Sequence, residues 1–158
     1  MQLRSSAVII LVCALQSALV ASPGLTKSQI RTELVFTSLL GYILQHDIPN
    51  FHGPYFVEFN SLNDDFTSNN AMLTRVQVNF PQFRPMSRTS REPPFFDNVT
   101  KERGVQLAVY GFSFTSKSRA TVSVRFLSDK LAGAIYDYTL RQNKGKWRVI
   151  NKKTDGII

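Results

Sequence analysis

The residues of this chain best suited to chemistry are a carboxylate and two phenols near its C-terminal end. Asp137 stands between Tyr136 and Tyr138 in an apolar-rich stretch. Burial there would raise the pKa of the carboxyl group and suit it to proton transfer beside a tyrosine hydroxyl. In strand alternation, however, Asp137 falls on the polar side and faces solvent, and this second interpretation stays open. Asp137 is therefore the best carboxylate candidate for catalysis in the sequence.

Two histidines and a pair of aspartates are the remaining polar candidates. His46 and His52 lie near the end of a predicted helix, where each can act as an acid or base or can be an ordinary surface residue. Asp64 and Asp65 can bind a cation, although a turn and a helix N-terminus also explain them. No third ligand stands at zinc-like spacing, and no glycine-rich phosphate loop or nucleotide-binding signature occurs. We therefore expect neither a metal site nor a cofactor.

The first 21 residues have the pattern of a secretory signal peptide. Arg4 precedes an uncharged apolar run, residues 7–20, which is followed by small residues. A retained membrane anchor is the alternative, although the run is shorter than the about 20 residues of a spanning helix. Cys13, the single cysteine, lies in this segment, so a mature chain would have no disulfide and no reactive thiol. We expect a signal peptide at residues 1–21 and a secreted or extracytoplasmic protein.

The chain is basic, with 19 Lys and Arg against 11 Asp and Glu and a net charge of +8. Basic residues gather in segments 84–91, 101–103 and 141–153. Such clusters suit anionic surfaces or polysaccharide, but they also occur on soluble proteins without any such partner. No run is dense enough to resemble a nucleic-acid-binding arm, so we expect no nucleic acid partner. We expect membrane contact only if the N-terminal segment is retained.

A glycosylation motif follows the proline-rich part of the chain. Asn98, Val99 and Thr100 form the Asn-x-Thr sequon. Asn98 is the expected acceptor if the protein is exported from a eukaryotic host. The motif is short, and it also occurs by coincidence.

Four apolar-rich stretches in the C-terminal third predict a β-meander. They show the period-two alternation of strands that have one buried face and one solvated face. Short polar connections at 115–118 and 143–146 force antiparallel neighbours. The predicted strands are residues 105–114, 121–126, 134–140 and a short 147–150.

An amphipathic helix over residues 25–45 is the predicted cover for this meander. Thr26 is its expected N-cap, and Gln29 completes a capping box. The other predicted elements are a strand at 55–60, a helix near 67–76 and a proline-rich loop at 79–94. The sequence thus predicts an α+β fold that forms one domain over residues 25–152.

The last predicted hairpin resembles that of a known superfamily. Residues 136–149 combine a tyrosine-rich strand, a polar turn with glycine and a Lys-Trp-x-Val strand. These features are similar to the terminal hairpin of the nuclear-transport-factor-2-like superfamily, which has the cystatin-like fold. The likeness covers most of residues 26–150, and the middle of the chain resembles small exported members without an assigned activity. The resemblance implies a cone in which a curved antiparallel sheet wraps the N-terminal helix and leaves a pocket at the open end.

The resemblance also implies a pocket and a choice of functions. The expected pocket residues are Tyr110, Tyr136, Tyr138, Phe36 and Leu40, and ordinary core packing is the other interpretation of these tyrosines. Members include isomerases, dehydratases, ligand carriers and assembly modules, so the fold does not fix the function. We expect an exported domain that binds a small apolar ligand or a protein partner without catalysis. The alternatives are an isomerase or dehydratase that uses Asp137 with a pocket tyrosine, and a membrane-anchored assembly module. A homodimer through the sheet is compatible with each.

Overall fold

The computed structural model describes residues 25–47, 51–59, 69–90, 92–129 and 132–157. The expected signal peptide at 1–21, with Cys13, lies outside the described residues, and so do Asp64 and Asp65. Within the described ranges, no helix has both the length and the apolar character needed to cross a membrane.

The first helix within the described residues is α2, which spans Lys27–Tyr42 and continues as a π-helical segment, η2 (Ile43–Asp47). The oxygen of the Thr26 side chain accepts a hydrogen bond from the Gln29 backbone N–H at 3.2 Å. In return, the Gln29 side chain accepts a hydrogen bond from the Thr26 backbone N–H at 2.8 Å. The predicted capping box is therefore confirmed, and the helix begins where the sequence places it.

The strands form one six-stranded sheet with the order β2-β1-β3-β4-β5-β6. Their bounds are β1 Tyr55–Phe59, β2 Phe83–Pro85, β3 Val105–Ser116, β4 Arg119–Asp129, β5 Ala132–Asn143 and β6 Lys146–Ile157. The last four strands pair antiparallel with their chain neighbours, which confirms the predicted meander. The molecule is therefore an α+β protein.

The expectation of a wholly antiparallel sheet is wrong, because β1 pairs parallel with both β2 and β3. A parallel pair needs a long crossover, and the connection from β1 to β3 includes α3 (Asn69–Asn79), β2 and a 3₁₀ turn, η4 (Met86–Arg88). The predicted proline-rich loop thus contains a short strand. This strand is at the edge of the sheet, the position at which a ladder tolerates Pro85.

The last strand is longer than the predicted residues 147–150. β6 has 12 residues and runs past residue 152, where we expected the domain to end. Two register shifts leave Ile150 and Asp155 without a directly opposite residue on β5. Such bulges disrupt the alternation of side chains, so the polar segment after Ile150 does not have the pattern of a strand.

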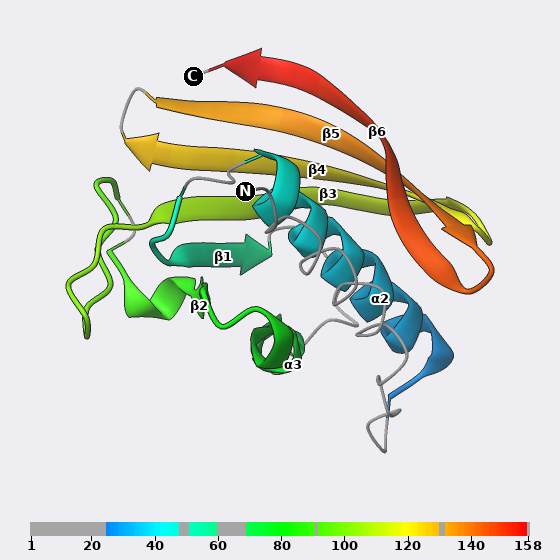
Figure 1. Cartoon of the computed structure of the whole chain (residues 1–158), viewed down its shortest axis with the longest axis horizontal. Helices are drawn as coiled ribbons and strands as arrows, with labels where there is room; N and C mark the ends of the chain where they lie inside the picture. The colour runs from blue at the N-terminus through cyan, green and yellow to red at the C-terminus, as the bar shows by residue number, and fades with distance from the viewer. Residues whose placement is uncertain (1–24, 48–50, 60–68, 91, 130–131, 158) are drawn as a thin grey trace, which may run out of the picture.

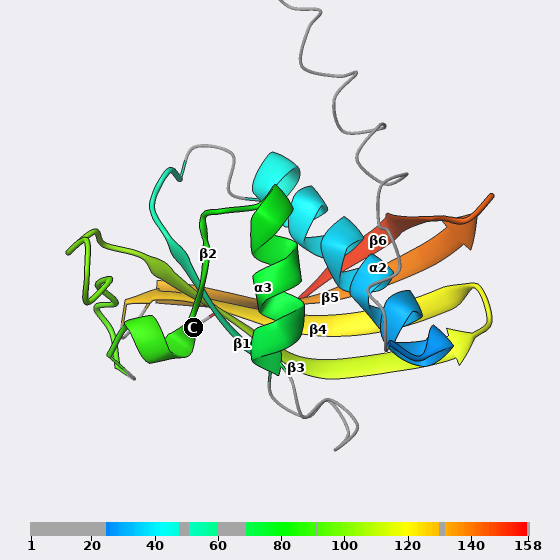
Figure 2. The same ribbon diagram turned by 90° about the horizontal axis from the view of Figure 1, so that it is seen from below.

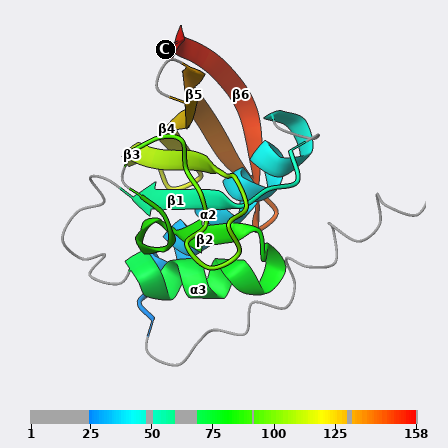
Figure 3. The ribbon, with the colours of Figure 1, turned by 90° about the vertical axis from the view of Figure 1, so that its left-hand side faces the viewer.

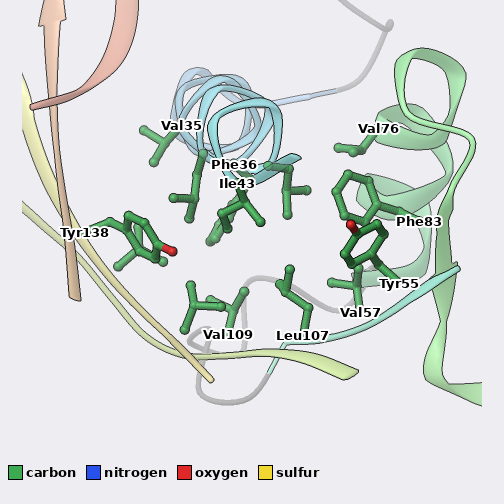
Figure 4. Packing of buried hydrophobic residues seen from close by; sticks show 14 of the residues in the cluster. Val35, Phe36, Ile43, Tyr55, Val57, Val76, Phe83, Leu107, Val109 and Tyr138 are labelled. Atoms are coloured by element: carbon green, nitrogen blue, oxygen red, sulfur yellow. The ribbon is translucent and has the colours of Figure 1, made fainter. Parts of the chain in front are cut away.

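Both helices pack on the same face of the sheet (Figures 1 and 2). Viewed from one end, the sheet is curved, and α2 lies on its concave side and contacts β6 (Figure 3). Phe36 of α2, Leu107 and Val109 of β3 and Tyr138 of β5 meet in the space between them (Figure 4). All four have no exposed surface, so the core is tightly packed where they meet.

The outer face of the sheet carries a smaller apolar cluster near β1 and β3. Phe56 and Phe95 are fully buried there but are not part of the main core. Gly104 lies directly against this cluster. A Cβ atom at Gly104 would lie 2.4 Å from the Phe56 ring and 2.5 Å from the Pro54 carbonyl oxygen. Only glycine therefore fits where the segment after η4 rejoins the sheet.

Gly104→Ala is expected to lower the free energy of unfolding by about 1–2 kcal/mol, since the added methyl group overpacks a site formed partly by backbone. Urea unfolding measures the change. Gly156→Ala is the matched control, because its added Cβ would meet only the end of the Ile135 side chain, at 3.9 Å. Equal effects of the two substitutions would contradict the close approach at Gly104.

Candidate functional site

Asp137 and the neighbouring tyrosine lie on opposite faces of the sheet. Tyr138 points into the core and has no exposed surface. Asp137 is on the outer face, where the hydroxyl of Ser123 donates a hydrogen bond to its Oδ1 at 2.5 Å. Because β5 separates the two groups, Asp137 and Tyr138 cannot act on one substrate atom. The sequence alternation placed Asp137 on the correct side.

Tyr110 is also on the outer face, apart from the other expected pocket residues. The register between β3 and β4 shifts between Val109 and Gly111, and Tyr110 is the extra residue. Burial raises its pKa, and the negative charges of Asp137 and Asp155 raise it further. Val109, the residue before Tyr110, is in the main core, and the bulge lets Phe112 pack against the same core, so Tyr110 stays on the outer face.

The other expected pocket residues are on the concave side, and three of them are part of the filled core. Phe36, Leu40 and Tyr138 have no exposed surface. The Phe36 ring packs edge-on against Phe59, with ring centroids 5.3 Å apart. Tyr136 is half-buried beside the core. The five residues therefore do not line one common surface.

A buried polar cluster, which the sequence did not predict, joins the end of the first helix to β5 and β6. The Tyr138 hydroxyl donates a hydrogen bond to Asp47 Oδ2 at 2.6 Å. Lys152 Nζ donates a hydrogen bond to Asp47 Oδ1 at the same distance. Lys152 Nζ also lies 3.7 Å from the centroid of the Tyr136 ring. We call Asp47, Tyr138 and Lys152 the Asp47 cluster.

The electrostatics of the Asp47 cluster favour a role in stabilising the fold over a role in proton transfer. Burial raises the pKa of Tyr138, and the hydrogen bond to Asp47 and its negative charge raise it further. The hydroxyl proton is therefore held, and both carboxylate oxygens already have a donor. No local sequence signal reveals this set, because Asp47 is 91 residues from Tyr138 and 105 from Lys152.

A second buried carboxylate lies outside the main core, in the segment that precedes β3. The Asp97 side chain is 1% exposed, and its Oδ1 accepts a hydrogen bond from Arg88 Nη2 at 2.8 Å. The backbone N–H groups of Val99 and Thr100 donate to the same oxygen, at 2.8 and 3.1 Å. Arg84 Nε is 4.0 Å from Oδ2. This network holds the turn that carries the sequon.

The remaining candidates are surface residues. His46 is exposed and packs its ring against Tyr42, with centroids 4.4 Å apart, and His52 is exposed as well. Asn98 is exposed in the turn, as an acceptor of a glycan must be. Among the described residues, no three His, Cys, Asp or Glu side chains gather as a metal site would require.

We compared the chain with protein-family models, with curated proteins and with solved structures, and none of the three comparisons gave a match.

Proposed function

We propose that this chain is an exported, non-catalytic binding domain, and that it binds a macromolecular partner rather than a small apolar ligand. One observation carries the proposal: the side chains that would line an apolar pocket fill the interior themselves. Phe36, Leu40 and Tyr138 have no exposed surface, so a ligand would have to displace them. Binding is therefore left to the outside of the molecule.

We also propose that the domain is nuclear-transport-factor-2-like, with the cone architecture that this implies. The order of elements supports the assignment, from a capped helix through a short strand and a second helix to a meander of long strands. The terminal hairpin supports it too, because Lys144 and Gly145 form its two-residue turn with φ values of 48° and 79°. A tight turn of this kind matches the right-handed twist of the flanking strands.

The two alternative functions have less support. An isomerase or dehydratase would need a base and a tyrosine facing one substrate. Asp137 and Tyr138 are on opposite faces, and of the expected pocket tyrosines Tyr110 shares the open outer face with Asp137. A membrane-anchored module depends on residues 1–21, which are outside the described ranges. Mass analysis of the secreted chain distinguishes cleavage from retention of that segment.

The secreted chain is expected to show no saturable binding of Nile red, a neutral apolar dye that becomes fluorescent in apolar sites. The filled interior leaves no room for the dye. Leu40→Ala is the positive control, since truncating a fully buried leucine opens an apolar cavity that can accept such a molecule. Circular dichroism checks that the variant is folded. Saturable binding of the dye by the unchanged chain would overturn the assignment of a macromolecular partner.

A further inference from the structure

Three arginines form a row across the outer face of the sheet. Arg119 of β4 is directly opposite Arg141 of β5, and Arg141 is directly opposite Arg148 of β6. All three are exposed. Their chain neighbours Ala120, Leu140 and Trp147 are buried on the concave side, so the arginines project outward. We call these residues the arginine row.

Repulsion within the arginine row lowers the stability of the fold, and no ion pair among the described residues offsets it. Like charges directly opposite each other on neighbouring strands repel. Among the described residues, the ion pairs involve Arg75, Arg84, Arg88, Arg103 and Lys152, and none involves the row. Segments 104–128 and 138–154 contain no Asp or Glu, and Asp137, on the same outer face, accepts a hydrogen bond from Ser123. A retained repulsion of this kind points to an anionic ligand that relieves it.

The surroundings of the row indicate what else the ligand carries. Lys117 and Lys144 extend the positive charge onto the two hairpin turns at the same end of the sheet (Figure 1). Beside the arginines, a second row of neutral hydrogen-bonding groups crosses the same three strands. Its members are Thr121, Thr139 and Asn151, paired in register. The surface therefore offers guanidinium groups for anions and, next to them, partners for hydroxyl groups.

The same surface lacks the features that protein partners, membrane surfaces and single-stranded nucleic acids require. Of the large hydrophobic side chains exposed in the described part of the chain, Ile150 adjoins Asn151, Ile157 is opposite Ala134 at the other end of β6, and Tyr110 is on β3, outside the two rows. A protein partner needs buried aromatic or aliphatic anchors, and a membrane surface needs apolar residues that insert. Single-stranded nucleic acid needs exposed aromatic rings for stacking. A hydroxyl-rich polymer with repeated anionic groups is the remaining fit.

We propose that the arginine row and the adjacent row of Thr121, Thr139 and Asn151 bind a sulfated polysaccharide. The guanidinium groups pair with sulfates along the polymer, because their planar forks match oxyanions in two-point contacts. Neighbouring strands are about 4.8 Å apart, so the row spans about 10 Å and engages more than one anionic group. This inference rests on the proposed binding of a macromolecular partner.

Binding of heparin, a sulfated polysaccharide, by the secreted chain tests the proposal. Arg119→Ser, Arg141→Ser and Arg148→Ser, combined, are expected to weaken heparin binding roughly tenfold or more and to reduce its salt dependence. The matched control combines Lys27→Ser, Lys101→Ser and Arg103→Ser, which removes the same charge from exposed positions outside β4, β5 and β6. The control should change the affinity by less than about twofold at equal salt. Equal losses in both variants would overturn the site.

The ligand class is tested with further probes on the same chain. Desulfated heparin, poly-glutamate, vesicles of anionic phospholipid and DNA should each bind more weakly than heparin. Preference for any of them would overturn the assignment to a sulfated polysaccharide.

Thr121→Val combined with Thr139→Val keeps the charge and shape, and should weaken heparin binding because it removes two hydroxyl groups of the second row. Unchanged binding would overturn the role of the second row. Failure of heparin to bind would overturn this inference alone, whereas the Nile red result tests the macromolecular binding function separately.

Discussion

Asp47→Ala is expected to lower the free energy of unfolding by about 3 kcal/mol, because it removes the acceptor of a buried hydroxyl and of a partly buried ammonium group. Tyr138 has no exposed surface and cannot turn its hydroxyl to water. Lys152 is 26% exposed and keeps its contact with the Tyr136 ring, so it loses less. Urea unfolding followed by the fluorescence of Trp147, the single and buried tryptophan, measures the change.

A double-mutant cycle tests whether the Asp47 cluster acts as a unit. Tyr138→Phe removes only the hydroxyl and is expected to cost about 1–2 kcal/mol, since Asp47 keeps its pair with Lys152. The losses of the two single variants should sum to more than the loss measured for the double variant, with a coupling energy of about 1 kcal/mol. Strict additivity would contradict the hydrogen bond between the two side chains. Heparin affinity should be unchanged in every folded variant, because the cluster is on the concave side.

The elements that are determined locally could be predicted from the sequence. Thr26 and Gln29 are three residues apart, and their two hydrogen bonds need no other part of the chain. Strand β4 carries its burial pattern in the alternation of its own side chains, whereas the first five residues of β3 are all buried. The same alternation gave the correct face for Asp137. Predictions that depend only on residues close together in the sequence were therefore reliable.

Features that depend on long-range pairing could not be predicted. β1 could pair with any strand, and its parallel pairing with β3 follows from a crossover of which no single residue is diagnostic. Bulges have the same effect, since the extra residue at Tyr110 lets Val109 and Phe112 both face the core, which strict alternation does not predict. The Asp47 cluster joins residues from opposite ends of the chain. The expected pocket came from the family resemblance, which did not fix the side of the sheet on which Tyr110 lies.

The arginine row follows from the register of the strands, which the amino-acid composition does not reveal. Segment 141–153 was noted as basic from the sequence, but a run of basic residues is compatible with a solvated surface. The pairing of Arg141 with both Arg119 and Arg148 converts that run into a single outward-facing line of charge. The functional proposal depends on this alignment and not on the net charge.

Asp97→Asn is expected to lower the free energy of unfolding by about 2–3 kcal/mol at neutral pH, because a buried carboxylate loses its charge beside Arg88 and Arg84. The effect stays at the low end for a buried ion pair, since both arginines are partly exposed and can reach water. The asparagine oxygen can still accept from Val99 and Thr100. Asp129→Asn is the control: Asp129 is half-exposed and pairs with an exposed Arg103, so the loss should be below about 1 kcal/mol.

The pH dependence of stability distinguishes the contribution of the Asp97 charge from that of its packing and hydrogen-bond geometry. Burial raises the pKa of this carboxyl group, but the hydrogen bonds from Val99, Arg88 and Thr100 and the positive charge of Arg88 outweigh it and lower the pKa below the usual value. Its contribution to stability is therefore fully present above the unfolded-state pKa of about 4 and is lost as the pH falls through the lower folded-state value. Urea unfolding between about pH 6 and pH 2 should show the variant converging on the parent chain at the acid end. A constant difference across that range would mean that the loss comes from packing or hydrogen-bond geometry and not from the buried charge.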